Sequence, residues 1–157
     1  MLKKIFALVA AVMVAVPAVA AAPDGWRTYN NARFGYTTCY PETLRPLRAS
    51  DNNDGRVFRA PDAKISVWGE NNVFEQSLGQ HAASLRTADE VVTYRAVRPN
   101  WIVQSGTKGA LIFWRKSFKR DDQFITIEVH YAANQRQKYD AMIKSISSCS
   151  TLGQPAY

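Results

Sequence analysis

Few residues in this chain are suited to acid–base or metal chemistry. Only two of its 157 residues are cysteine and only two are histidine. It has no Cys-x-x-Cys pair and no His-Glu-x-x-His motif, which argues against a zinc site. Ser105 follows Gln104 and lacks the first glycine of a Gly-x-Ser-x-Gly nucleophile elbow. No motif therefore names an activity, and we predict neither a metal ion nor a cofactor.

Long apolar runs are also absent, except near the start of the chain. Residues 5–16 are all apolar, follow Lys3 and Lys4, and precede Pro17 and several small residues. This is the pattern of a secretory signal peptide, and the run is shorter than the roughly 20 residues of a membrane-spanning helix. We predict a signal peptide over residues 1–22, cleaved near Ala20 to Ala22. The mature protein would be periplasmic or secreted, with no transmembrane segment.

The two cysteines, Cys39 and Cys149, are far apart in the sequence. An even number of cysteines in an exported protein favours a disulfide. The alternative is a reactive thiol, but Cys149 has no acid–base partner near it in the sequence. We predict a Cys39–Cys149 disulfide that ties the first part of the domain to its last helix.

Alternating apolar and polar residues, separated by turn residues, predict a series of strands. Helical spacing of apolar residues predicts a helix over 75–87 and a second one that begins near Asn134 and includes Cys149. Gln137 would form a capping box at the start of the second helix. The predicted strands span residues 26–30, 34–40, 56–59, 64–69, 91–98, 101–105, 110–119 and 124–131.

Together these elements predict one globular α+β domain over residues 23–150, followed by a flexible tail over 151–157. The last four strands would form an antiparallel meander. The fold would be an antiparallel sheet of about six or seven strands, packed by two main helices in an α/β/α-sandwich-like layout.

Four stretches of the chain also resemble a known group of proteins. They are WRTYNNARFGYTTCYP near the start, the DGRVF strand, the KISVWG strand and the closing amphipathic helix. The pattern resembles small exported bacterial proteins of unknown function, and the layout is similar to the α/β/α sandwich of the photosystem oxygen-evolving PsbP type. The resemblance implies a fold and an exported location. It supplies no catalytic residues, and a fold alone does not give a function.

Glu128 and His130 are the candidates for catalysis. They lie two positions apart on the predicted strand 124–131, so their side chains share one face of the sheet. A glutamate beside a histidine can orient it as a general base, and a small hydrolase would add a nearby serine or threonine. The alternative is a polar pair with no catalytic role. His81 is expected at the edge of the first helix.

Basic residues are more prominent than any motif. The chain has 20 lysines and arginines against 13 acidic residues, a net charge of +7. Trp68, Trp101 and Trp114 are strand aromatics that could stack beside cations. Two regions serve as candidate contact surfaces, the loop 42–59 and the exit of a strand at 69–72. The predicted binding residues are Arg45, Arg48, Arg56, Arg59, Lys116, Lys119 and Arg120.

We therefore predict a non-enzymatic binding module with a basic surface. Its partner would be an acidic envelope protein, an acidic polymer or an anionic membrane surface. Nucleic acid is not expected as a partner of an exported protein. Three alternatives stay open: the hydrolase, an envelope structural or stress protein, and a solvated surface with buried tryptophans.

Overall fold

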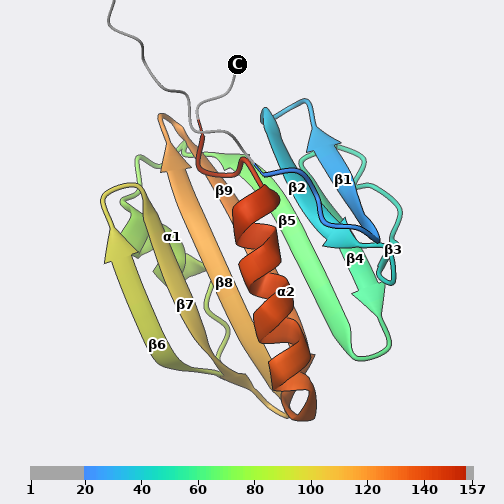
Figure 1. The fold of residues 1–157 in the computed structure, drawn as a ribbon. Coiled ribbons are helices and arrows are strands. Elements are labelled where there is room, and N and C mark those ends of the chain that lie inside the picture. The colour runs from blue at the N-terminus through green and yellow to red at the C-terminus, as the bar shows by residue number, and fades with distance from the viewer. Residues whose placement is uncertain (1–19, 155–157) are drawn as a thin grey trace, which may run out of the picture.

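A computed structural model describes residues 20–154. Seven antiparallel strands form the main sheet, and two more form a separate hairpin (Figure 1). The strands are β1 (Trp26–Asn31), β2 (Tyr36–Pro41), β3 (Arg45–Pro46), β4 (Gly55–Ala60), β5 (Ala63–Asn71), β6 (Glu90–Arg98), β7 (Trp101–Lys108), β8 (Leu111–Arg120) and β9 (Gln123–Ala132). Their order in the main sheet is β3-β4-β5-β9-β8-β7-β6.

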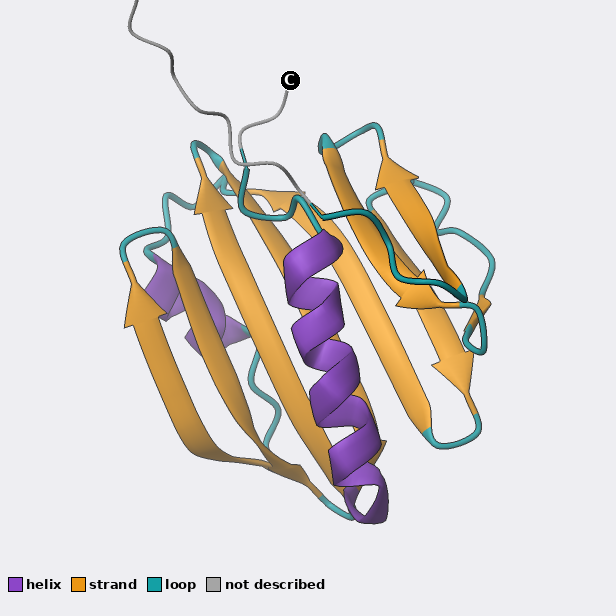
Figure 2. Ribbon diagram, in the orientation of Figure 1, coloured by secondary structure: helices purple, strands orange, loops and turns teal. Residues whose placement is uncertain are grey.

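Helices α1 (Leu78–Ser84) and α2 (Arg136–Cys149) lie on opposite faces of this sheet (Figure 2). We call these faces the α1 face and the α2 face. The predicted α+β class, the meander β6-β7-β8-β9 and the sandwich layout are therefore confirmed. Among residues 20–154 no helix has both the length and the apolarity to cross a membrane. The predicted signal peptide lies almost entirely outside the described residues.

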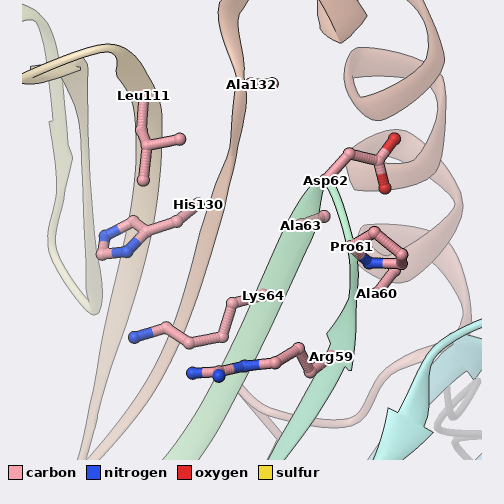
Figure 3. A pocket seen from close by; sticks show the side chains of 9 residues that line it. All are labelled: Arg59, Ala60, Pro61, Asp62, Ala63, Lys64, Leu111, His130 and Ala132. Atoms are coloured by element: carbon pink, nitrogen blue, oxygen red, sulfur yellow. The ribbon is translucent and has the colours of Figure 1, made fainter.

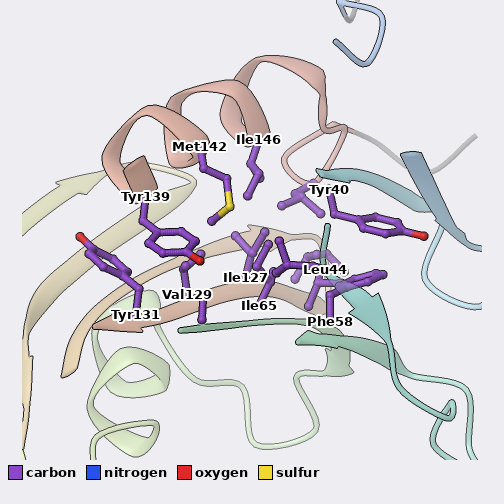
Figure 4. Packing of buried hydrophobic residues seen from close by; sticks show 14 of the residues in the cluster. Tyr40, Leu44, Phe58, Ile65, Ile127, Val129, Tyr131, Tyr139, Met142 and Ile146 are labelled. Atoms are coloured by element: carbon purple, nitrogen blue, oxygen red, sulfur yellow. The ribbon is translucent and has the colours of Figure 1, made fainter. Parts of the chain in front are cut away.

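The main core fills the α2 face. Tyr139, Met142 and Ile146 of α2 pack on Ile65 and Ile127 of the sheet (Figure 4). Burying a side chain of this size stabilises the fold by about 1.5–3 kcal/mol. The hairpin β1–β2 extends the same core alongside α2.

The predicted disulfide links Cys39 of β2 to Cys149 at the end of α2, with 6.0 Å between their Cα atoms. This confirms the prediction and fastens the β1–β2 hairpin to the helix. Gly69 of β5 has a packing role, because a Cβ atom there would lie 2.3 Å from the Phe34 ring.

Helix α1 is shorter than the predicted range of 75–87. Glu75 has a positive φ of 52°, which a right-handed helix does not accommodate. Ser77 is the N-cap instead, and it forms a capping box with Gln80. At α2 the predicted capping box is wrong. A 3₁₀ turn (Ala133–Gln135) leads into that helix, whose N-cap residue Gln135 makes no side-chain hydrogen bond.

The flexible tail predicted for residues 151–157 is wrong for 151–154. Leu152 is buried in the main core. The Thr151 amide donates to the Thr37 carbonyl at 3.0 Å. Arg120 donates to the Gln154 carbonyl at 2.6 Å. Residues 155–157 lie outside the described part of the chain.

Candidate functional site

The α1 face is polar over most of its area. The short helix α1 covers one end of it, where Leu78 and Ala82 pack on Ile102 and Phe124. Beyond that apolar patch, β5, β8 and β9 direct polar side chains to this face, among them the charged Lys64, Arg115 and Glu128. This charged face is the candidate functional site.

A buried ionic cluster occupies the middle of the α1 face. Arg115 donates to both oxygens of Glu90, at 2.8 and 3.3 Å, and also pairs with Glu128. Lys108 Nζ lies 3.6 Å from Glu90 Oε1. Burial raises the pKa of Glu90, but the hydrogen bonds and charge of Arg115 outweigh it, and the pKa is lowered overall. Two cations thus balance two carboxylates inside the fold.

His130 borders this cluster and is buried. Its Nε2 lies 3.1 Å from Glu128 Oε1 but makes no hydrogen bond within residues 20–154. Burial lowers the pKa of His130, and Lys64, Lys108 and Arg115 lower it further, whereas Glu128 raises it. Because the lowering effects win, His130 is neutral near pH 7.

Glu128 and His130 are therefore neighbours, as their spacing on the strand predicts. No hydroxyl within residues 20–154 is hydrogen-bonded to His130. Ser66 lies on the same face, opposite Glu128. Ser105 lies on the other face, opposite Trp114. A general-base mechanism needs a nucleophile within hydrogen-bond reach of the base.

Ligand atoms for a metal ion also converge here. One atom each of Glu90, Glu128 and His130 fall within 4.8 Å of one another. Both carboxylates, however, already pair with Arg115. A cation would have to displace this guanidinium and overcome its charge. The arrangement suits a structural ion cluster better than a metal site.

His81 is a core residue, which corrects its predicted place at a helix edge. Its side chain is 2% exposed, stacks on Phe124 with 4.0 Å between ring centres, and lies 3.2 Å from Thr126 Oγ1. Burial lowers its pKa to about 4, with a further contribution from Arg115. His81 is therefore neutral at pH 7 and helps seat α1 on the sheet.

Three cationic side chains form a line across neighbouring strands on the α1 face, next to His130. Arg45 of β3 lies directly opposite Arg59 of β4, Arg59 opposite Lys64 of β5, and Lys64 opposite His130 of β9. Directly opposite residues of antiparallel strands point to the same face. We call Arg45, Arg59 and Lys64 the basic row. None of the three forms a salt bridge within residues 20–154.

A pocket opens beside the basic row. It has a volume of about 360 Å³ and is lined by Arg59, Lys64, Leu111 and His130 together with the β4–β5 turn. The side chains of Arg59, Lys64 and His130 extend toward the same side, whereas Asp62 points away from them (Figure 3). Asp62 is hydrogen-bonded to Tyr139 at 2.6 Å instead. The pocket therefore presents positive charge.

The other predicted binding residues do not join this row. Arg48 pairs with Asp51 in the exposed loop. Arg56 points to the opposite face from Arg59 and donates to the Leu47 carbonyl at 2.8 Å. Lys119 donates to the Gln76 carbonyl at 3.2 Å at the end of the α1 face. Of the seven predicted cations, only Arg45 and Arg59 lie in the row.

Two more predicted contacts have structural roles. Arg120 is 8% exposed. Its guanidinium donates to the backbone carbonyls of Phe34, Gly35 and Gln154, so this charge is not available to a partner at the surface. At the predicted exit surface 69–72, Asn72 bonds to both the amide and the carbonyl of Gln76. These residues hold loops in place.

Lys64 is a functional candidate that sequence reasoning missed, although a local signal was present. The predicted hairpin turn 60–63 places Arg59 and Lys64 opposite each other. Arg115 and Glu90 were also missed as partners of Glu128. Only the side-by-side arrangement of β6, β7, β8 and β9 brings these three together.

In comparisons with known proteins, neither a family model nor a curated protein matches this sequence. A solved structure does match its fold. The solution structure of cyanobacterial PsbP (CyanoP) from Synechocystis sp. PCC 6803 is similar with a TM-score of 0.60. The alignment covers 88% of this chain and 97% of that chain, at 14% sequence identity. The chain therefore has a PsbP-like fold, as its sequence pattern predicts.

Proposed function

We propose that this protein is an exported, non-enzymatic binding module that holds an extended acidic chain on its basic row. The N-terminal sequence pattern supports export. The disulfide supports it too, because such bonds persist in oxidising compartments.

The observation that carries the proposal is the direct opposition of like charges. Arg45, Arg59 and Lys64 are consecutive cross-strand neighbours with no acidic partner within residues 20–154. Like charges directly opposite each other destabilise a sheet. An anionic partner would relieve that repulsion, so the arrangement favours a complex with an acidic chain over the free protein.

The geometry suggests an extended partner. Neighbouring strands are about 4.8 Å apart, so the basic row presents one cation per strand along a line across β3, β4 and β5. Closely spaced carboxylates or phosphates on one chain could meet these cations in succession. The pocket beside Lys64 and His130 would take the group at the end of the row.

Binding of polyglutamate to the oxidised mature protein, residues 23–157, tests the proposal. We expect Arg59→Gln with Lys64→Gln to weaken binding at least about tenfold, since each charge-assisted hydrogen bond contributes about 1.5–3 kcal/mol. Affinity should also fall steeply between low and high salt. The matched control is Arg86→Gln with Arg95→Gln, which removes the same charge from two exposed residues outside the row.

Two results would contradict the proposal. Equal weakening by both double variants would show that net charge alone attracts the polymer. Binding to phosphatidylglycerol vesicles without binding to polyglutamate would assign the row to a membrane surface. Unchanged thermal unfolding of each variant would show that the fold is intact.

A further inference from the structure

A second groove lies on the α2 face, away from the basic row. It runs between α2 and strand β8, with a volume of about 140 Å³. Trp114, Lys116 and Phe118 of β8 line one side, and Ile146 of α2 and Leu152 line the other. We call it the Lys116 groove.

Lys116 is a half-buried cation without a counter-ion. It forms no salt bridge within residues 20–154, and burial alone lowers its pKa. Its Nζ lies 4.5 Å from the ring centre of Trp101 and 4.8 Å from that of Phe118. Arg98 approaches the Trp101 ring as well, with Cζ 5.6 Å from the centre. Contact with aromatic rings offsets only part of the free-energy cost of removing an ammonium group from water.

The shape of the groove restricts what could supply the missing negative charge. Trp114 and Phe118 are only partly exposed and line a recess, which a flat bilayer surface would not fill. Strands β7 and β8 are paired on both sides, so their backbones offer no free edge to an extended peptide. The volume is below the roughly 300–1,000 Å³ of pockets for drug-sized ligands, so it suits one ring or a short chain.

We propose that the Lys116 groove binds a small carboxylate with a flat, apolar body. The carboxylate would meet the Lys116 ammonium, and the apolar body would lie against Trp114, Ile146 and Leu152. Hydrophobic walls with one fixed charged group are the usual composition of a small-ligand site. This proposal stands independently of the basic row, because the two sites lie on opposite faces of the sheet.

Benzoate is a suitable probe, and benzamide is its neutral analogue. Titration of the ¹⁵N-labelled mature protein should shift the indole N–H signals of Trp101 and Trp114 in a saturable way. The signals of Trp26 and Trp68 should stay in place and serve as internal controls. Benzamide should bind about ten- to a hundredfold more weakly, the loss expected for one charge-assisted hydrogen bond.

Lys116→Met removes the charge and keeps most of the side-chain length. We expect it to reduce benzoate affinity to that of benzamide, without lowering the melting temperature of the free protein. Lys119→Met is the matched control, because Lys119 lies on the same strand and over an aromatic ring, Phe124, but on the α1 face. It should leave benzoate binding unchanged.

Four outcomes would overturn the proposal. Benzamide could bind as tightly as benzoate, or Lys119→Met could weaken binding as much as Lys116→Met. Phosphatidylglycerol vesicles could shift the two indole signals while benzoate does not, which would make the groove a membrane contact. A lower melting temperature of Lys116→Met, together with no benzoate binding by the wild type, would assign Lys116 to packing alone.

Discussion

The α2 face of the main sheet is apolar and packed under a long helix, whereas the α1 face carries charged side chains and has a short helix over one end only. A helix of 14 residues, α2, packs on the first, and a helix of seven residues, α1, packs on one end of the second. The same strands build both faces, because successive side chains point in opposite directions. On β9, for example, Ile127 is in the main core and Glu128 is in the ionic cluster.

This contrast indicates that apolar packing and clustered charge are divided between alternate residues of single strands. Apolar burial and the disulfide stabilise the α2 face. The α1 face contains buried ions, which are costly to desolvate, and the unpaired basic row. Such charges are weak sources of stability, and our proposal assigns binding of an acidic chain to the basic row alone. Three changes in stability can test this division.

Loss of the disulfide should have the largest effect. Cys39→Ser with Cys149→Ser removes a link between residues 110 positions apart. We expect the free energy of unfolding to fall by about 4–5 kcal/mol, because the unfolded chain regains the entropy of a long open loop. Urea denaturation measures this, and reduced wild-type protein should show the same loss. A loss below about 1 kcal/mol would mean that the α2 face is held by packing alone.

Loss of Arg115 should have the next largest effect. Arg115→Met leaves the buried Glu90 and the partly buried Glu128 without their main partner, which should destabilise the fold by about 3–5 kcal/mol at pH 7. Part of the loss should be recovered in acid, where the buried Glu90 carboxylate becomes protonated and no longer lacks a counter-ion. Glu90→Gln and Glu128→Gln added to Arg115→Met should also restore stability.

Arg95→Met is the control for this prediction. Arg95 lies on the α1 face in line with Arg115, because Gln104 is opposite both residues, but Arg95 is exposed. Its loss should change the free energy of unfolding by no more than about 0.5 kcal/mol. Equal effects of the two substitutions would refute the idea of a buried ionic cluster.

The sequence predicts the local parts of this architecture well. Alternation locates every strand except β3, which has only two residues and no period to detect. Turns between neighbouring strands also determine which residues face each other. The Asp121-Asp122 turn sets the register in which Arg115 opposes Glu128. That part of the site follows from local sequence.

The rest of the site depends on contacts between distant segments. Lys64 lies beside His130 because β5 pairs with β9, and no short-range pattern specifies that pairing. The packing of residues 151–154 is also a long-range feature. Leu152 is held by a core built from earlier strands, which its polar neighbours in the sequence do not reveal.

Acidification should have the smallest of the three effects on the free energy of unfolding. It should act through His81, at the end of the α1 face that α1 covers. Burial lowers the pKa of His81 to about 4 from an ordinary value of 6.5. The unfolded chain therefore binds a proton at a higher pH than the folded protein. Stability from neutral His81 is complete above pH 6.5 and declines as the pH falls toward 4, by about 3 kcal/mol in total.

Urea denaturation at pH 7, 5.5 and 4.5 measures this decline. His81→Gln should be less stable at pH 7, because it loses the stack on Phe124, but its stability should depend less on pH. His130→Gln should keep most of the dependence, although the pKa of His130 is lowered in the same direction. If His81→Gln and the wild type decline in parallel, the proton uptake arises elsewhere, and the end of the α1 face under α1 is not the acid-sensitive part of the fold.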